Sequence, residues 1–281
     1  MSGNAQRLSV YTKLPVVAIT TTRQRIFLTV LLMIGIATLA LVSGVLIGCI
    51  GIGGVLLVPC LSLAGVDVHE AIGASMFSFI FSGGIGVWLY ARRGSIEWRS
   101  AVWLGAGAMP GAFLGAVLAA HTGAEILLML VGVTVVFAGW RLLRRQSGGP
   151  NHGAVRFESP LLVGIGAAVG IASAVTGTGG PVLLVPLLMW WGVPVLASVG
   201  LSQAIQVPIA LMASLGNFWT GSLDLPLAAL LSIGITLGSA VGARVAHAVP
   251  AVFLARVVAV VLVLVGIVVA VRSGHTLART W

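Results

Sequence analysis

Two glycine-rich segments contain the residues that are best suited to bind a ligand. The first glycine break is residues 51–54, Gly-Ile-Gly-Gly, and the second glycine break is residues 177–180, Gly-Thr-Gly-Gly. A short apolar segment follows each break directly. A helix that begins at such a break points its unpaired backbone N–H groups and its positive dipole end at whatever lies in front of it. This pattern predicts that backbone donors bind a small anion.

Polar side chains near the breaks extend this predicted anion site. Thr176 and Thr178 bring hydroxyl donors to the second break, and Gln203 and Gln206 lie inside a later apolar run. A glutamine in the middle of a membrane span is costly unless it faces a partner or a pore. The alternative is structural: the glycines permit close helix packing, and the polar side chains hydrogen-bond between helices. The predicted substrate-binding residues are Gly51, Gly53, Gly54, Ser75, Thr176, Gly177, Thr178, Gly179, Gly180, Ser202, Gln203 and Gln206.

The remaining ionisable and nucleophilic residues do not form a catalytic set. Glu97 and Asp224 each follow Gly-Ser at the start of a span. They could couple transport to protons, but a carboxylate that complements the dipole at a helix start is the favoured interpretation. The five histidines are scattered without a metal-ligand spacing, and Cys49 and Cys60 flank the first break alone. We therefore predict no enzyme activity, no metal site and no cofactor.

The two breaks belong to a duplicated unit. One residue, Pro181, is inserted in the second copy, and beyond it the match holds at a constant offset of 127. The matched pairs are Gly65 and Gly192, Gly73 and Gly200, Ser75 and Ser202, Gly94 and Gly221, Glu97 and Asp224, and the glycines 107, 111 and 115 with 234, 238 and 242. Duplicated hydrophobic halves with a helix interrupted in the same place are typical of secondary transporters.

Composition places these segments in a membrane. The 281 residues are 59% hydrophobic and 7% charged, whereas soluble domains are about 25% charged. The formal net charge is +9, but the arginines punctuate long apolar runs, so a nucleic-acid-binding surface is not indicated. The sequence predicts an all-α polytopic membrane protein with about eight transmembrane helices in two homologous halves, each with a short or re-entrant helix after its break.

The predicted divisions of the chain follow its apolar runs. Full spans are expected at residues 26–47, 70–91, 98–120, 124–143, 160–175, 196–219, 225–247 and 252–271, and short pieces at 55–64 and 181–191. The divisions are a cytoplasmic segment 1–25, a first repeat 26–143, a cytoplasmic linker 144–158, a second repeat 159–272 and a cytoplasmic tail 273–281.

Arginine positions favour a particular orientation. With re-entrant short pieces, four full spans per half place the amino-terminal, linker and tail arginines together on the cytoplasmic side of the plasma membrane. An inverted five-plus-five arrangement, in which the short pieces cross, is the second choice.

In its order of motifs, the chain resembles the TauE/SafE family of sulfite and organosulfonate exporters. The resemblance covers about residues 42–272 and rests on the duplicated Gly-x-Gly-Gly…Val-Pro segments, Ala74-Ser75 with Leu201-Ser202, and the two Gly-Ser turns with Glu97 and Asp224. Val55 and Pro181 each stand where the family has a third glycine.

This resemblance implies a transporter of sulfite, sulfoacetate or another organosulfonate, working as an exporter and driven by a proton gradient or the membrane potential. The alternatives are an anion channel or a transporter of an unrelated small organic anion. The expected partners are the small anionic substrate and the lipid bilayer, without nucleic acid. The glycine faces are compatible with a monomer or a homodimer.

Overall fold

The computed structural model describes residues 14–50, 54–143 and 159–245, together with 260, 263, 264 and 266–268. Helices account for the regular structure of these residues, which confirms the predicted all-α class. The long helices are α2 (Leu14–Ile50), α4 (Val68–Arg92), α5 (Trp98–Ala120), α6 (Ala124–Leu143), α7 (Ser159–Thr176), α9 (Val195–Trp219) and α10 (Leu225–Val245). The linker, most of the predicted last span, Gly51 and Gly53 lie outside the described residues.

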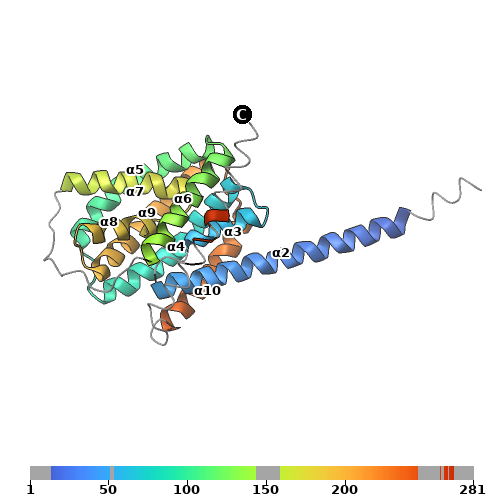
Figure 1. Cartoon of the computed structure of the whole chain (residues 1–281), viewed down its shortest axis with the longest axis horizontal. Helices are drawn as coiled ribbons and strands as arrows, with labels where there is room; N and C mark the ends of the chain where they lie inside the picture. Colours follow the sequence, from blue (N-terminus) through green and yellow to red (C-terminus); the bar gives the residue numbers. More distant parts are fainter. Residues whose placement is uncertain are drawn as a thin grey trace, which may run out of the picture.

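Two short helices follow the breaks, as the duplicated pattern predicts. Helix α3 (Leu57–Leu63) follows the 3-10 turn η1 (Gly54–Leu56), and helix α8 (Pro181–Trp190) follows the second break. Neither is long enough to cross a bilayer core of about 30 Å at 1.5 Å per residue. Both lie within the bundle formed by the long helices (Figure 1).

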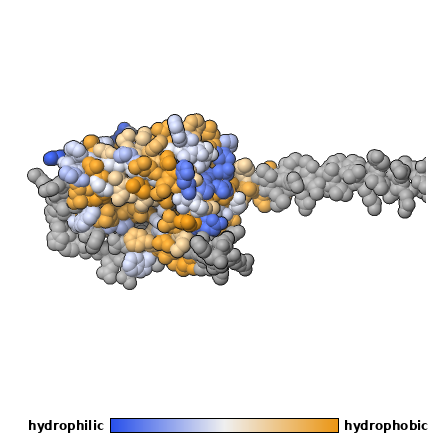
Figure 2. All heavy atoms as spheres, turned by 90° about the horizontal axis from the view of Figure 1, so that it is seen from above, coloured by the Kyte–Doolittle hydropathy of each residue, from blue (hydrophilic) through white to orange (hydrophobic). Residues whose placement is uncertain are grey.

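The outer surface of the bundle is suited to lipid. Among the described residues, six helices are long and apolar enough to span a membrane. Large apolar side chains point outward in the middle of these helices, and Figure 2 shows hydrophobic residues across the centre of the face, with hydrophilic ones toward its ends. The chain is therefore a multi-pass membrane protein. Helix α2 extends far beyond the other helices (Figure 1).

Close glycine contacts interlock the two halves. The glycines of α5 approach backbone carbonyls of α7, and the equivalent glycines of α10 approach the equivalent carbonyls of α2. The pairs are Gly107–Val163, Gly111–Ala167 and Gly115–Ile171, then Gly234–Ala37, Gly238–Leu41 and Gly242–Val45. Each pair of helices combines one helix from either half, so neither half packs as a separate bundle.

The turns after α4 and α9 confirm that the copies are structurally equivalent. Gly94 and Gly221 have φ of 63° and 76°, a conformation that glycine adopts without a steric penalty and that ends helices. A Cβ added at Gly73 would lie 2.5 Å from the carbonyl oxygen of Ser222. A Cβ added at Gly200 would lie 2.6 Å from the carbonyl oxygen of Ser95. Gly200 is equivalent to Gly73 and Ser95 to Ser222, so the two contacts are related by the duplication. The halves are thus related by a pseudo-two-fold axis.

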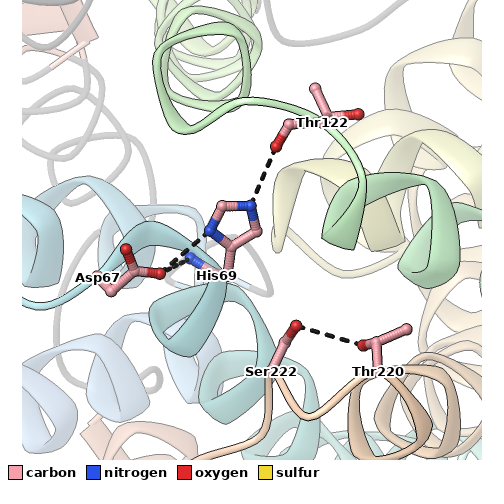
Figure 3. Close-up of polar contacts among 5 residues, drawn as sticks. All are labelled: Asp67, His69, Thr122, Thr220 and Ser222. Atoms are coloured by element: carbon pink, nitrogen blue, oxygen red, sulfur yellow. Dashed lines mark hydrogen bonds and ion pairs between the residues drawn. The ribbon is translucent and has the colours of Figure 1, made fainter.

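The direction of this axis follows from α4 and α9, the equivalent central helices. Gly83 contacts Val207, and Gly86, further along α4, contacts Gln203, nearer the start of α9. The two helices are therefore antiparallel. Figure 3 shows the same relation at one end of the bundle, where the start of α4 lies beside the turn that follows α9. Equivalent helices that run in opposite directions across a membrane form an inverted repeat.

The other helices agree with the inverted repeat. Helices α2 and α10 are parallel because successive glycines of α10 meet successive carbonyls of α2, and α5 and α7 are parallel for the same reason. Helix α10 begins beside Gly73, near the start of α4, and packs along that helix. Helix α9 runs beside α5 in the same direction, with Gly105 facing Pro208 and Gly216 facing Ala116. It follows that α2 and α4 run one way, whereas α7 and α9 run the other.

This arrangement corrects the orientation that the arginines favoured. Because α2 and α4 are parallel, α3 carries the chain back toward the end where α2 began, and α8 does the same between α7 and α9. The short pieces therefore do not return the chain to the side from which they entered. Helices α2 and α7 start at opposite ends of the bundle, whereas the favoured orientation requires both to start at the cytoplasmic side. The predicted orientation treats each short helix as re-entrant. The helix directions show instead that each short helix carries the chain toward the end where the preceding long helix began.

We expect Gly170→Ala to destabilise the protein, whereas Gly164→Ala on the same helix is tolerated. A Cβ at Gly170 would lie 2.5 Å from the backbone oxygen of Ala108, while one at Gly164 has no atom within 4 Å. Overpacking against backbone costs about 1–3 kcal/mol. The measurement is the thermal unfolding midpoint in detergent, and equal midpoints for the two variants would contradict close packing of α5 and α7.

The inverted repeat predicts that equivalent turns lie on opposite sides of the membrane. Single cysteines at Glu97 and its equivalent Asp224 would be tested in a background without Cys49 and Cys60. A membrane-impermeant thiol reagent added to sealed, uniformly oriented vesicles should modify one of the two and spare the other. Parallel halves would instead give modification of both or of neither. Detergent-solubilised protein, in which both should react, is the control.

Candidate functional site

The second break is held by its own hydrogen bonds. Helix α7 ends at Thr176, Gly177 takes φ of 63°, and the N–H of Thr178 donates to the carbonyl of Ser173 over 3.3 Å. The Ser173 hydroxyl donates to the carbonyl of Gly179 at 3.2 Å. These bonds fold the break back over the end of α7 and fix the place where α8 begins.

The two threonine hydroxyls at this break bond to each other. The oxygen atoms of Thr176 and Thr178 are 2.9 Å apart, and Thr176 also donates to the carbonyl of Ala172 at 2.7 Å. A hydroxyl has one proton to donate. The Thr176 hydroxyl donates to the carbonyl of Ala172, so it accepts the hydrogen bond from the Thr178 hydroxyl. Both hydroxyls are therefore engaged within the break in this conformation, rather than directed at a ligand.

The ring of Phe79 lies between the two breaks. A Cβ added at Gly54 would lie 2.5 Å from two edge atoms of this ring, and one added at Gly179 would lie 3.3 Å from its Cδ2 atom. Phe79 is 1% exposed and sits in the middle of α4. The breaks therefore meet at one buried aromatic side chain, and glycine at both positions leaves room for it. Gly177 of the second break also adjoins Val58 of α3, the short helix that follows the first break.

Gln203 and Gln206 are both buried on the face of α9 that packs against α4. The Nε2 atom of Gln206 donates to the hydroxyl of Ser82 at 3.3 Å. The Oε1 atoms of both glutamines are buried and have no hydrogen-bond partner among the described residues. A buried amide oxygen without a partner costs about 1–3 kcal/mol, so these two atoms are candidates for contact with water or a ligand.

The structure places the predicted site residues at the centre of the bundle and toward both of its ends. Gly54 and Gly179 face the ring of Phe79, and Gly177 and Gly180 face apolar side chains of α3, α4 and α9. Gln206 lies on α9, beside α4. Ser75 and Ser202 are buried toward opposite ends of the antiparallel pair α4 and α9, so they do not share one binding position. Ser202 donates to the carbonyl of Val199 within its own helix.

Phe79 and Ser82 were missed by the sequence analysis. A phenylalanine in an apolar run carries no signal of its own. The spacing of Ser75, Ser78 and Ser82 by three and four residues could have indicated a polar helix face, because such residues lie above one another.

The ionisable residues of the turns have local structural partners. Asp224 accepts a hydrogen bond from the N–H of Leu227 at 2.9 Å, and Glu97 accepts one from the hydroxyl of Ser100 at 3.0 Å. At the end of the bundle shown in Figure 3, His69 lies between the carboxylate of Asp67 at 3.1 Å and the carbonyl of Thr122 at 3.0 Å. These contacts are those of helix-end groups. No cluster of metal-ligating side chains is found within the described ranges.

Together, the inverted halves, the two breaks at the bundle centre and the buried amides define a polytopic membrane protein built like a secondary transporter. Residues 36–269 match the family model described as "Sulfite exporter TauE/SafE". The chain therefore belongs to the TauE/SafE family. The match spans both halves, and it confirms the resemblance inferred from the motifs.

Curated relatives agree with this membership. The chain is 26% identical to "Probable membrane transporter protein YdhB" of Bacillus subtilis (strain 168), over 75% of this chain and 89% of the relative. It is 28% identical to a "Probable membrane transporter protein" of Xylella fastidiosa (strain 9a5c), over 83% of this chain and 93% of the relative. No solved structure matches the chain. Membership in this family establishes a membrane transporter.

The position of Phe79 predicts an energetic coupling with Gly54. Gly54→Ala should lower the thermal midpoint because its methyl group would overlap the ring, and Phe79→Leu should recover part of that loss by making room. The double-mutant cycle should give a favourable coupling of about 0.5–3 kcal/mol. Gly84→Ala, on α4 with no atom within 4 Å, is the control and should be additive with Phe79→Leu. Additive effects of Gly54→Ala and Phe79→Leu would contradict a contact between the first break and the ring.

Proposed function

We propose that this protein is a secondary transporter that moves a small sulfur-containing anion, such as sulfite, sulfoacetate or another organosulfonate, across the plasma membrane. The observation that carries the proposal is the meeting of two glycine breaks from inverted halves at the bundle centre, beside a buried glutamine. The family description as sulfite exporters supports the substrate class and the direction of export.

Backbone and amide donors suit an oxyanion at this position. At the start of α8, Pro181 has no N–H group, and the N–H of Leu184 donates to the carbonyl of Gly180. The N–H groups of Val182 and Leu183 have no partner within the helix. Gly179 and Gly180 lie directly before the helix and allow an anion to approach this backbone closely. Rotation of the Gln206 amide by about 180° would present its NH₂ group in place of the unpaired oxygen.

Recognition by dipoles and amides leaves the anion's charge uncompensated. No lysine or arginine side chain is found among the buried residues of the described ranges. We propose that the proton gradient or the membrane potential drives transport, because a site of this kind transfers the substrate's own charge across the membrane. The exposed arginines Arg92, Arg93 and Arg99 mark the end of the bundle that we assign to the cytoplasm.

Ligand-dependent stabilisation tests this function. Purified protein would be heated with sulfite, sulfoacetate, taurine or sulfate, and one sulfur oxyanion should raise the unfolding midpoint, since a ligand of the native state stabilises it in proportion to occupancy. Gly179→Leu should weaken that binding by about tenfold or more, because its side chain would keep the anion from the backbone N–H groups and so prevent a charge-assisted hydrogen bond of about 1.5–3 kcal/mol.

The matched control is Gly221→Leu. Gly221 has φ of 76°, close to the 72° of Gly179, but a Cβ there has no atom within 4 Å. Both variants carry the same backbone strain, so selective loss of binding in Gly179→Leu assigns the effect to the site. Absence of stabilisation by any of the four anions in the unsubstituted protein would contradict the substrate class. Binding unchanged in Gly179→Leu would contradict the site.

A further inference from the structure

Buried polar atoms without partners are concentrated between α4 and α9. Within the described ranges, six buried side-chain atoms lack a hydrogen bond, and five belong to these two helices. They are Ser75 Oγ, Gln203 Oε1, Gln206 Oε1, Ser214 Oγ and Asn217 Nδ2; the sixth, Ser43 Oγ, is on α2. Each of the five residues is at most 5% exposed. Inside a membrane no water reaches such atoms unless the protein provides a path for it.

These side chains form a stripe on each helix. On α9, Gln203, Gln206, Ser214 and Asn217 fall on one face by helical spacing, and the two glutamines contact α4 there. On α4, Ser75, Ser82 and Gly86 share the face that meets α9, where Ser82 bonds to Gln206. We call this contact surface the α4–α9 seam. It extends along the two central helices of the inverted halves.

Phe79 interrupts the seam at its centre. Four residues after Ser75 and three before Ser82, it falls on the same face of α4. The antiparallel register, fixed where Ser82 meets Gln206, places Ser75 near the level of Ser214. The polar groups therefore divide into one set with Ser75, Ser214 and Asn217, and another with Ser82, Gln203 and Gln206. The aromatic ring that adjoins both glycine breaks lies between the two sets.

Pseudo-symmetry supports a specialised role for Phe79. Its equivalent in the second half is Gln206, and the equivalent of Ser82 is Ile209. At the symmetry-related position, the hydrogen-bonded pair of Ser82 and Gln206 is replaced by the apolar pair of Ile209 and Phe79. One side of the centre is polar and the other is closed by hydrocarbon. The contacts of Gly73 with Ser222 and of Gly200 with Ser95 recur in both halves. The centre of the seam lacks this symmetry, because Gly83 and Gly86 of α4 correspond to Ala210 and Ala213 of α9.

We propose that the α4–α9 seam is the translocation pathway and that Phe79 is its central gate. The proposal deepens the transport function given above and rests on it. In the conformation seen here, the ring closes the seam at the level of the breaks. Polar groups on either side bind water or substrate when the corresponding half of the seam opens. A continuously open channel is disfavoured because the polar stripe is broken at Phe79.

Cysteine accessibility tests the pathway without knowledge of the substrate. Ser75→Cys, Ser214→Cys and Ser82→Cys are close in size to serine and would be made singly in a background without Cys49 and Cys60. A small membrane-impermeant methanethiosulfonate would be added to right-side-out or to inside-out vesicles. We expect Ser75→Cys and Ser214→Cys to react from one side and Ser82→Cys from the other, each about tenfold faster than two control cysteines outside the seam, because reaction requires an accessible thiolate.

Two controls separate the seam from other environments. Ser239→Cys replaces a buried serine that donates to the carbonyl of Gly44 between α10 and α2, away from the seam. Leu215→Cys lies beside Ser214 but points outward, with Leu215 50% exposed. Seam cysteines that react no faster than both controls, or that all react from the same side, would overturn the proposal.

The gate itself is tested by adding substitutions of Phe79. With Phe79→Ala, Ser82→Cys should react from both sides, whereas Phe79→Leu should keep the reaction one-sided because it retains an apolar side chain of similar bulk. One-sided reaction with Phe79→Ala would overturn the assignment of the gate. Should Phe79→Ala fail to fold, the sidedness of the single cysteines and of Phe79→Leu still decides the pathway. Thiol labelling requires no anion, so a wrong substrate class would not affect it.

Discussion

Backbone-to-backbone contact at glycine is the interaction on which the rest of the structure depends. Along α5 with α7 and along α10 with α2, a carbonyl oxygen of one helix occupies the space where a side chain would begin on the other. In lipid, helix association relies on such close packing because burial of apolar groups gains little. Each contact joins one half to the other. This packing of helices from different halves holds the inverted copies together and leaves α4 and α9 side by side at the centre.

The central helices are thereby free to carry polar groups. The outer pairs supply tight apolar packing. Helices α4 and α9 contain buried side chains with an atom that lacks a hydrogen bond, namely Ser75, Gln203, Gln206, Ser214 and Asn217. The short helices α3 and α8 bring the two breaks to the middle of this pair, on either side of Phe79. A stable framework outside and a poorly satisfied interior are what a protein needs if its centre is to change conformation while its fold persists.

Much of this architecture could be predicted from the sequence. Apolar length gave the bounds of α5 and α6 to the residue, and the offset of 127 identified turns that share one backbone conformation. The direction of the halves could not be obtained in the same way. The path of a seven-residue helix such as α3 decides it, and neither hydropathy nor arginine counts determine that path. The position of Phe79 could not be predicted either, because it depends on tertiary packing: a glycine from each half adjoins its ring.

The exchange of helices between the halves has a consequence for biogenesis. Helix α2 is synthesised before the other described helices, but its packing partner, α10, comes last among the helices from α2 to α10. Until α10 is inserted, the carbonyl-lined groove of α2 has only lipid or the insertion machinery beside it. Helices α5 and α7, separated by α6 and the linker, can pair much earlier. Assembly is therefore expected to proceed from the centre of the sequence outward, with α2 held in the bilayer until the final helices arrive.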